Sequence, residues 1–207
     1  MKRISKDPVV RRKEIIQTAQ KLFAEQGYTS TPVEAIIKSA GIAKGTFYYY
    51  FKSKHELLGA IVEQISADLQ QYYTSVLETK ELSVIEKLKR MLRGPEKNLL
   101  SDPEIMEIFH LPENREFQEK VSIQTIEVIA PLIAEVVIQG NREGVFKADN
   151  PLEIIQILLA SSLFLLDGGL FEWVPDKQSA LLQTLQALFE MAIGVGPGEL
   201  DFISHTG

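Results

Sequence analysis

The chain has 207 residues, of which 45% are apolar and 24% are charged, and its formal net charge is −6. This length and ordinary composition exclude a disordered or low-complexity protein and allow one large or two modest domains. The absence of cysteine excludes disulfides, thiolate catalysis and cysteine-ligated zinc. No apolar run follows the charged first residues, so we expect no signal peptide and a cytoplasmic location.

The charge is distributed unevenly along the chain. Residues 1–55 hold eleven Lys and Arg against four Asp and Glu, a net charge of +7, so the remaining 152 residues carry −13. A basic module on an acidic body is expected when that module meets a polyanion. Charge alone fits a solvated basic surface equally well, so the motifs must distinguish the two interpretations.

Helical periodicity dominates the chain, and no convincing alternation of period two is present, which predicts an all-α protein. Residues 9–26 carry one apolar stripe that ends at Gly27, a residue suited to helix termination. The run Thr31-Pro32-Val33-Glu34 predicts a capping box at the start of a second helix, which ends at Gly41.

A third short helix is expected over about residues 43–50, only two or three residues after the second. Two short helices joined by a tight glycine turn are typical of a helix-turn-helix. Phe47 and Phe51 lie four residues apart, so we expect both to face inward and anchor this helix.

A long helix is predicted over residues 54–78, opened by a second capping box, Ser53-Lys54-His55-Glu56. At 1.5 Å per residue it extends roughly 35 Å, long enough to leave the N-terminal module. Further helices are expected over residues 82–93, 102–111 and 114–143, the last with a kink at Pro131.

The two C-terminal segments are strongly apolar. Residues 151–173 are apolar almost all round, but the uninterrupted stretch from Ile157 to Leu166 is about half of a bilayer span. We therefore expect a helix buried on several sides and no membrane partner. Residues 177–193 predict a helix with an apolar packing stripe, and the glycine-rich tail 194–207 is expected to fray.

The outward residues of the third helix suit a DNA major groove. Lys44 and Lys54 bracket it and can reach phosphates, and Thr46 offers a short hydroxyl. Gly45 removes side-chain bulk, so the backbone can approach DNA. Tyr48 to Tyr50 offer hydroxyls for phosphates and ring edges for thymine methyls.

Three stretches carry a family resemblance: Phe23-Ala24-Glu25-Gln26-Gly27-Tyr28, Ala40-Gly41-Ile42, and Lys44-Gly45-Thr46-Phe47-Tyr48-Tyr49-Tyr50-Phe51-Lys52-Ser53-Lys54-His55-Glu56-Leu57. With them, residues 9–58 resemble the DNA-binding domain of the TetR/AcrR family of transcriptional regulators. The resemblance implies an all-helical homodimer of about nine helices per subunit. The first three helices would bind DNA, the last two would form a four-helix dimer interface, and a ligand pocket would lie in the C-terminal domain. The resemblance fades after about residue 75.

Carried over by position, the resemblance implies that Gly45, Thr46 and Tyr48 to Tyr50 are recognition-helix contacts. It implies that Lys54 binds phosphate and that Thr31 is the cap that donates to phosphate at the second helix. Ile37 departs from the pattern, because the family usually has a small Ala there. The predicted domains are residues 1–55, which bind DNA, and residues 56–207, which bind ligand and dimerise.

An enzyme would need its chemistry among His55, His110 and His205. Glu107 and His110 form a single Glu-x-x-His, whereas di-iron carboxylate bundles use that motif twice. The glycines of residues 194–198 follow no strand, so a phosphate loop is not expected. We therefore expect no enzymatic activity, no catalytic residues, no metal site and no cofactor.

The sequence predicts a ligand-responsive repressor that binds a pseudo-palindromic double-stranded DNA operator as a homodimer through the helices near residues 151–173 and 177–193. The effector is expected to be a hydrophobic small molecule. The alternative is a non-enzymatic helical interaction module whose basic N-terminal face binds an acidic protein or a membrane surface. The candidate pocket residues are Met91, Met106, Phe109, His110, Phe117, Gln124, Thr125 and Phe164.

Overall fold

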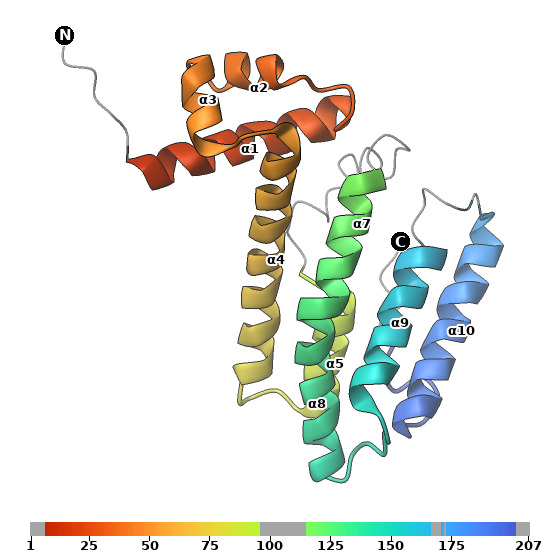
Figure 1. The fold of residues 1–207 in the computed structure, drawn as a ribbon. Helices are drawn as coiled ribbons and strands as arrows, with labels where there is room; N and C mark the ends of the chain where they lie inside the picture. The colour runs from red at the N-terminus through yellow and green to blue at the C-terminus, as the bar shows by residue number, and fades with distance from the viewer. Residues whose placement is uncertain (1–6, 96–114, 167–170, 172, 202–207) are drawn as a thin grey trace. The chain divides into compact units, whose positions relative to one another are not determined.

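A computed structural model describes residues 7–95, 115–166, 171 and 173–201 of the chain. Within those residues the secondary structure is entirely helical, as predicted (Figure 1). The chain forms two compact units, Met1–Ile65 with Pro103–Lys120, and Ser66–Asp102 with Val121–Gly207. The helices are α1 (Pro8–Gln26), α2 (Val33–Ser39), α3 (Lys44–Tyr50), α4 (Lys54–Glu78), α5 (Val84–Arg93), α7 (Arg115–Gln124), the π-helical turn η3 (Thr125–Ile129), α8 (Ala130–Arg142), α9 (Pro151–Leu165) and α10 (Pro175–Ile193).

The first unit packs α1, α2, α3 and the start of α4 around one apolar core. Phe47 of α3 and Phe51, the residue just after it, are almost completely buried, which confirms the prediction that both face inward. Their rings lie 6.0 Å apart. Apolar stripes at helical spacing on α1, α2 and α4 are buried in the same unit, and their fully buried members are Ile15, Ala19, Ile36, Leu57, Leu58 and Ile61.

The helix starts of the first unit differ in how they are capped. The predicted Thr31–Glu34 capping box is wrong, because α2 begins at Val33 after Pro32 and no side chain caps it. The second predicted box is formed in part: Ser53 Oγ accepts a hydrogen bond from the Glu56 N–H at 3.0 Å. The Glu56 carboxylate accepts from the N–H of Lys52 at 2.7 Å instead of that of Ser53. The cap therefore also fixes the residue before the box.

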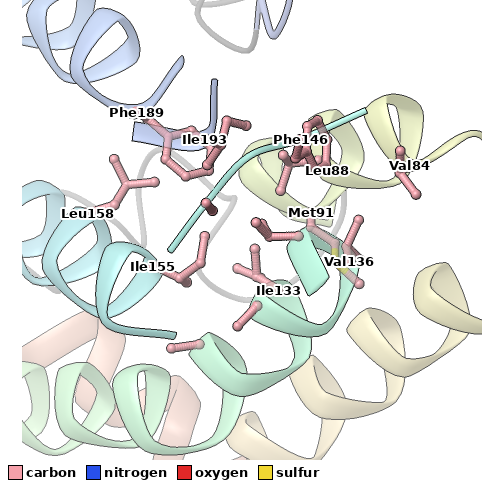
Figure 2. Packing of buried hydrophobic residues seen from close by; sticks show 14 of the residues in the cluster. Val84, Leu88, Met91, Ile133, Val136, Phe146, Ile155, Leu158, Phe189 and Ile193 are labelled. Carbon is pink, nitrogen blue, oxygen red and sulfur yellow. The ribbon is translucent and has the colours of Figure 1, made fainter. Parts of the chain in front are cut away.

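The second unit is built around α8, against which α5 and α9 pack (Figure 2). A kink was predicted at Pro131, and the π-helical turn η3 lies just before this proline and links α7 to α8. Because proline cannot donate a backbone hydrogen bond and its ring crowds the preceding turn, a widened turn just before it is the expected accommodation. The core side chains labelled in Figure 2 come from α5, α8, α9, α10 and the segment after α8: Val84, Leu88, Met91, Ile133, Val136, Phe146, Ile155, Leu158, Phe189 and Ile193.

The C-terminal helices correct two expectations. The helix predicted over residues 151–173 ends at Leu165, and its final carbonyl accepts a hydrogen bond from Trp173 Nε1 at 2.7 Å. It was expected to be buried on several sides, yet Ile155 and Leu158 are its buried residues, and Ile157 is 68% exposed. A single subunit covers only one face of α9.

Hydrogen bonds and one buried side chain hold the segment after α10 over residues 194–201, so the predicted fraying is wrong there. Leu200 is fully buried, and its N–H donates to Glu190 Oε1 at 3.0 Å. The Gly198 N–H donates to the other Glu190 oxygen at 2.9 Å. A buried carboxylate on α10 therefore orders the tail, an interaction that glycine content cannot reveal. Residues 202–207 lie outside the described part of the chain.

One stretch, Gln118–Glu143, is long and apolar enough to cross a membrane by length and composition. Its α8 portion supplies the centre of the second unit, where Ile133, Val136 and Val137 are buried. Packing against α5 and α9 accounts for the apolar character of these buried residues.

Candidate nucleic-acid interface

The α3 face is the exposed side of the third helix, formed by Lys44, Gly45, Tyr48 and Tyr49. Tyr49 is 78% exposed and Tyr48 is 44% exposed. The inward pair Phe47 and Phe51 holds this short helix against the core, so the residues between and before them point outward. A methyl group built on Gly45 would meet no other atom within 4 Å, which leaves the backbone accessible at that position.

The side chains of the α3 face contact one another and α2. The Tyr49 and Tyr50 rings meet edge to face with centroids 4.9 Å apart. Lys44 Nζ lies 5.9 Å from the Tyr48 ring and 3.5 Å from Glu34 Oε1. Both charges of the Lys44–Glu34 pair are exposed, so the pair contributes little stability and a phosphate can replace the carboxylate. Thr46 and Tyr50, also predicted contacts, are only partly exposed.

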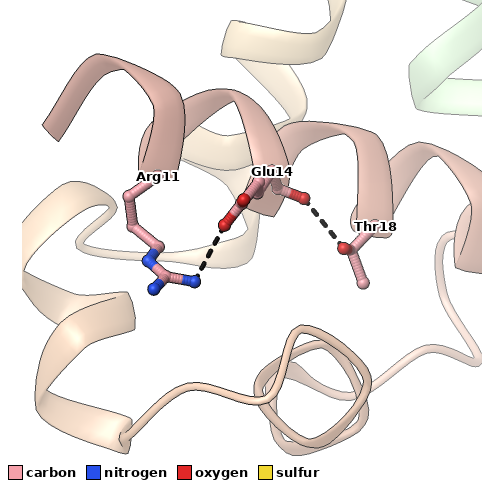
Figure 3. Close-up of polar contacts among 3 residues, drawn as sticks. All are labelled: Arg11, Glu14 and Thr18. Atoms are coloured by element: carbon pink, nitrogen blue, oxygen red, sulfur yellow. Dashed lines mark hydrogen bonds and ion pairs between the residues drawn. The ribbon is translucent and has the colours of Figure 1, made fainter. Parts of the chain in front are cut away.

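Basic residues of α1 belong to the same unit. Arg11 Nη1 lies 2.8 Å from Glu14 Oε2, and the Glu14 carbonyl accepts from Thr18 Oγ1 (Figure 3). Arg12 is exposed and its guanidinium lies 5.2 Å from the centre of the Phe51 ring. Arg12 therefore adds positive charge beside the end of α3.

Lys54, predicted to bind phosphate, is turned toward the loop between α1 and α2. Its Nζ donates to the carbonyl oxygens of Tyr28, Thr29 and Thr31 at 2.7, 3.2 and 3.1 Å. It also lies 4.4 Å from the centre of the Tyr28 ring. Burial lowers the pKa of Lys54 below its ordinary value, and the Glu116 carboxylate opposes this shift in part.

Thr31 is fully buried. Its hydroxyl donates to the carbonyl of Gly27 at 2.7 Å, with Leu22 O at 3.3 Å. With no exposed surface, this hydroxyl acts inside the loop, and the Thr31 side chain lies outside the exposed α3 face.

A contact that sequence analysis missed joins α4 to α7. His55 Nδ1 lies 2.7 Å from Glu116 Oε1, and both side chains are exposed. Glu116 also acts electrostatically on Lys54 and on Tyr28, whose pKa is raised by burial and, to a smaller extent, by this carboxylate. The residues are 61 positions apart in the sequence, so no local pattern could have indicated the contact.

The candidate pocket residues do not come together as one described group. Met91 is packed in the core of the second unit, and Phe164 is 58% exposed with its ring 5.6 Å from that of Phe171. Gln124 and Thr125 are half-buried where α7 meets η3, and the Thr125 hydroxyl donates to Val121 O. The other candidates, Met106, Phe109, His110 and the Phe117 side chain, lie outside the described residues.

Two models of known protein families match this chain. A model of bacterial regulatory proteins of the tetR family matches residues 15–61, and a model of tetracyclin repressor-like C-terminal domains matches residues 98–188. The chain belongs to the TetR family of transcriptional regulators. The resemblance found in the sequence is thereby confirmed, and the fold with an N-terminal helix-turn-helix and a C-terminal helical domain is the TetR fold.

Individual relatives are distant. The chain is 31% identical over 99 residues to the uncharacterized HTH-type transcriptional regulator YvaF of Bacillus subtilis, a match that covers 48% of each protein and so about half the length of that relative. It is 26% identical over 173 residues to the fatty acid metabolism regulator protein of Bacillus subtilis, covering 80% of this chain and 84% of the relative.

A solved TetR-family regulator from Pectobacterium atrosepticum has a TM-score of 0.65 with this chain. The two are 23% identical, and the alignment covers 93% of this chain and 97% of that one. At this identity the similarity concerns the TetR fold.

Proposed function

We propose that this TetR-family chain is a repressor that binds a pseudo-palindromic DNA operator as a homodimer and responds to a hydrophobic small molecule. The observation that carries the proposal is the α3 face, an exposed pair of tyrosines beside a lysine and an unobstructed glycine backbone. This face belongs to a quarter of the chain with a net charge of +7. The tyrosine hydroxyls suit phosphates, and the ring edges suit thymine methyl groups.

Three groups have separate roles in the proposed contact. Tyr48 and Tyr49 present hydroxyls and ring edges to the major groove, and Gly45 allows the backbone to approach. Lys44 and the α1 arginines supply affinity that depends on salt, because phosphate binding releases counterions. Thr46 and Tyr50 are half-buried and would contribute through their exposed edges.

Dimerisation is proposed through α9 and α10, the helices expected from residues 151–173 and 177–193. Ile157 on α9 is 68% exposed, and Met191 and Leu188 on α10 are 70% and 54% exposed. An exposed apolar surface formed by two adjacent helices is typical of a subunit interface. A two-fold dimer would present two α3 faces to successive major grooves, which requires a palindromic site.

The proposed effector is a hydrophobic small molecule bound in the C-terminal domain. One relative of this chain is named a fatty acid metabolism regulator, which supports an apolar effector without identifying it. Such an effector acts only if it binds one conformation more tightly than the other. The test is operator binding measured with a panel of fatty acids and acyl thioesters, and operator affinity that no compound alters would contradict the proposed response.

Selection of duplexes from a random pool tests the DNA-binding proposal directly. We expect enrichment of a palindrome, and we expect Tyr49→Ala to weaken binding to it about tenfold or more. Glu63→Ala, an exposed change on α4, is the control and should bind as the wild type does. A wild-type chain that enriches no sequence and binds all DNA alike would favour the basic interaction module instead.

A further inference from the structure

We propose that Glu34 is a specificity-determining residue, whose carboxylate accepts a hydrogen bond from a cytosine amino group in the operator and disfavours DNA of other sequence. The proposal rests on the proposed DNA-binding function and assigns a role within it. Residues 31–54 hold one acidic residue, Glu34, and four lysines, Lys38, Lys44, Lys52 and Lys54. A carboxylate within a surface that meets a polyanion weakens binding unless it finds a partner there.

Glu34 lies in the first turn of α2, beside the α3 face. Its Oε1 is 3.5 Å from Nζ of Lys44, the first residue of α3, and that Nζ is 5.9 Å from the centre of the Tyr48 ring. The ion pair therefore joins the start of α2 to the start of α3, across the turn of the helix-turn-helix. The first residues of a recognition helix are those that reach base edges. The pair thereby holds the Glu34 carboxylate next to the part of α3 that would enter the major groove.

Stability does not account for the place of this carboxylate. Both side chains of the Lys44–Glu34 pair are 67% exposed, and an exposed ion pair contributes little to folding because water and salt screen it. An acidic residue in the first turn of a helix also interacts favourably with the helix dipole. A carboxylate on any side of that turn would do so, and the dipole therefore gives no reason for its place beside Lys44.

The chemistry of a carboxylate restricts its partners on DNA. It accepts hydrogen bonds and donates none, and it offers about four acceptor positions, of which Lys44 uses one. The hydrogen-bond donors in the major groove are the amino groups of cytosine and adenine, and a carboxylate suits cytosine N4. Phosphates and base carbonyls present acceptors, which repel it. The Glu34 carboxylate therefore fits a sequence that places a cytosine amino group opposite it.

Lys44 makes such a contact compatible with a surface that binds phosphate. Its ammonium has three N–H donors, so one can remain on Glu34 while another binds a phosphate. Its charge also offsets that of the carboxylate beside the polyanion. On DNA without a cytosine at this point, the carboxylate would lose water and gain no donor, which lowers affinity for that sequence.

Affinities for two kinds of DNA test the proposal. The probes are the palindrome enriched by the wild type and sheared genomic DNA, and the variant is Glu34→Ala. We expect affinity for genomic DNA to rise, because a negative charge has left the interface, and affinity for the palindrome to fall. The ratio of the two affinities should decrease about tenfold or more.

The matched control is Glu25→Ala. Glu25 is an exposed acidic residue of α1 in the same unit, and its Oε1 lies 3.7 Å from Nζ of Lys21. Its removal changes the net charge equally, so it should alter the two affinities by one small common factor. A common factor in Glu34→Ala as well would overturn the proposal and leave the DNA-binding function intact.

Selection from the random pool identifies the base. We expect the wild type to prefer a cytosine at a position in each half-site where Glu34→Ala has no preference, with the other positions unchanged. Identical preferences at every position in the two chains would overturn the proposal. A wild type that enriches no sequence would overturn the DNA-binding proposal too, since Glu34 would have no specificity to determine.

Circular dichroism and thermal melting show whether the variant folds. Glu34 is exposed, so we expect Glu34→Ala to keep the helical signal and the melting temperature of the wild type. If α2 is lost in that variant, Glu34→Gln takes its place in both DNA experiments, because it keeps the length of the side chain and removes the charge. The same decrease in the affinity ratio is expected, and an unchanged ratio would overturn the proposal.

Discussion

At the scale of single residues, the lack of a Cβ atom at Gly140 allows a neighbouring ring to pack against the backbone. The ring of Phe146 occupies the space where a Gly140 side chain would lie, and the Gly140 carbonyl accepts from the N–H groups of Val145 and Phe146 at 2.9 and 3.1 Å. Phe146 is almost completely buried. The turn after α8 can therefore fold back on its own helix only because this position lacks a Cβ.

Gly140→Ala should lower the free energy of unfolding by about 1–3 kcal/mol, because the added methyl overpacks the Phe146 ring. Urea denaturation measures it. Gly59→Ala on α4 is the matched control, since a methyl there meets nothing within 4 Å. That change should raise stability by up to about 1 kcal/mol through helix propensity. Equal effects of the two substitutions would contradict the packing argument.

Glu190 is a second residue on which local order depends. Glu190→Ala removes a buried carboxylate that accepts from two tail N–H groups and from Gln186 Nε2. We expect a loss of about 3 kcal/mol in the free energy of unfolding, together with earlier proteolysis after Gly194. Glu199→Ala is the exposed control and should change neither. A tail as protease-resistant in Glu190→Ala as in the wild type would contradict the role of this carboxylate.

At the scale of elements, α4 and α5 satisfy each other's C-terminal carbonyls. The Tyr72 hydroxyl on α4 directs its one proton between Arg90 O and Gly94 O at the end of α5, which lie at 3.2 and 3.1 Å. Lys87 Nζ on α5 donates to Leu77 O near the end of α4 at 2.7 Å. The last carbonyls of a helix lack partners within it, so this exchange stabilises both ends at once. The C-terminal part of α4 is thereby held within the second unit.

Tyr73 on α4 should make the stability of the fold depend on pH in alkaline solution. Burial, and then the neighbouring Tyr72, raises the pKa of Tyr73 from 10.0 to about 12. The unfolded chain releases this proton near pH 10 and the folded chain only near pH 12, so stability is full below pH 10 and falls as the pH rises to about 12. The expected loss is about 2–3 kcal/mol.

Urea denaturation of the wild type and of Tyr73→Phe between pH 9 and about 12 isolates this contribution, because the other titrating groups are common to both chains. Across this interval the free energy of unfolding of the wild type should fall relative to that of Tyr73→Phe. A difference that stays constant with pH would show that the Tyr73 hydroxyl titrates alike in the folded and unfolded chains.

At the scale of the whole molecule, the proposed dimer accounts for the exposed apolar surface of α9 and α10. Leu188→Glu would place a charge in that interface, and we expect the dimer dissociation constant to rise about a hundredfold or more. Light scattering measures the mass of the particle in solution, which should fall from dimer to monomer. Affinity for the palindrome should fall as the dimer dissociates. Gln71→Glu, an exposed change on α4 that adds the same charge, is the control. A Leu188→Glu chain of unchanged dimer mass would place the interface elsewhere.

Features that depend on neighbours along the chain were predictable from the sequence. The bounds of α4 agree with the prediction over residues 54–78, and α3 agrees to within a residue. Apolar spacing and glycine stops lie within a few residues of each other, so they are visible before the chain folds. The inward positions of Phe47 and Phe51 followed from the same spacing, as did the family resemblance from an ordered local motif.

Features that depend on distant partners were decided only by the tertiary structure. The composition around Lys54 favours DNA, yet its ammonium meets carbonyls 23 to 26 positions earlier in the chain. Thr31 suits a helix cap by its neighbours, but the end of α1 supplies its acceptors. Residues 194–201 are rich in glycine, yet the buried Glu190 carboxylate on α10 orders them. Sequence pattern determined where helices such as α3 and α4 lie and which family the chain resembles, because those features depend on local spacing. Packing determined which polar groups remain available for DNA, because a hydrogen bond formed inside the fold removes a donor from its surface.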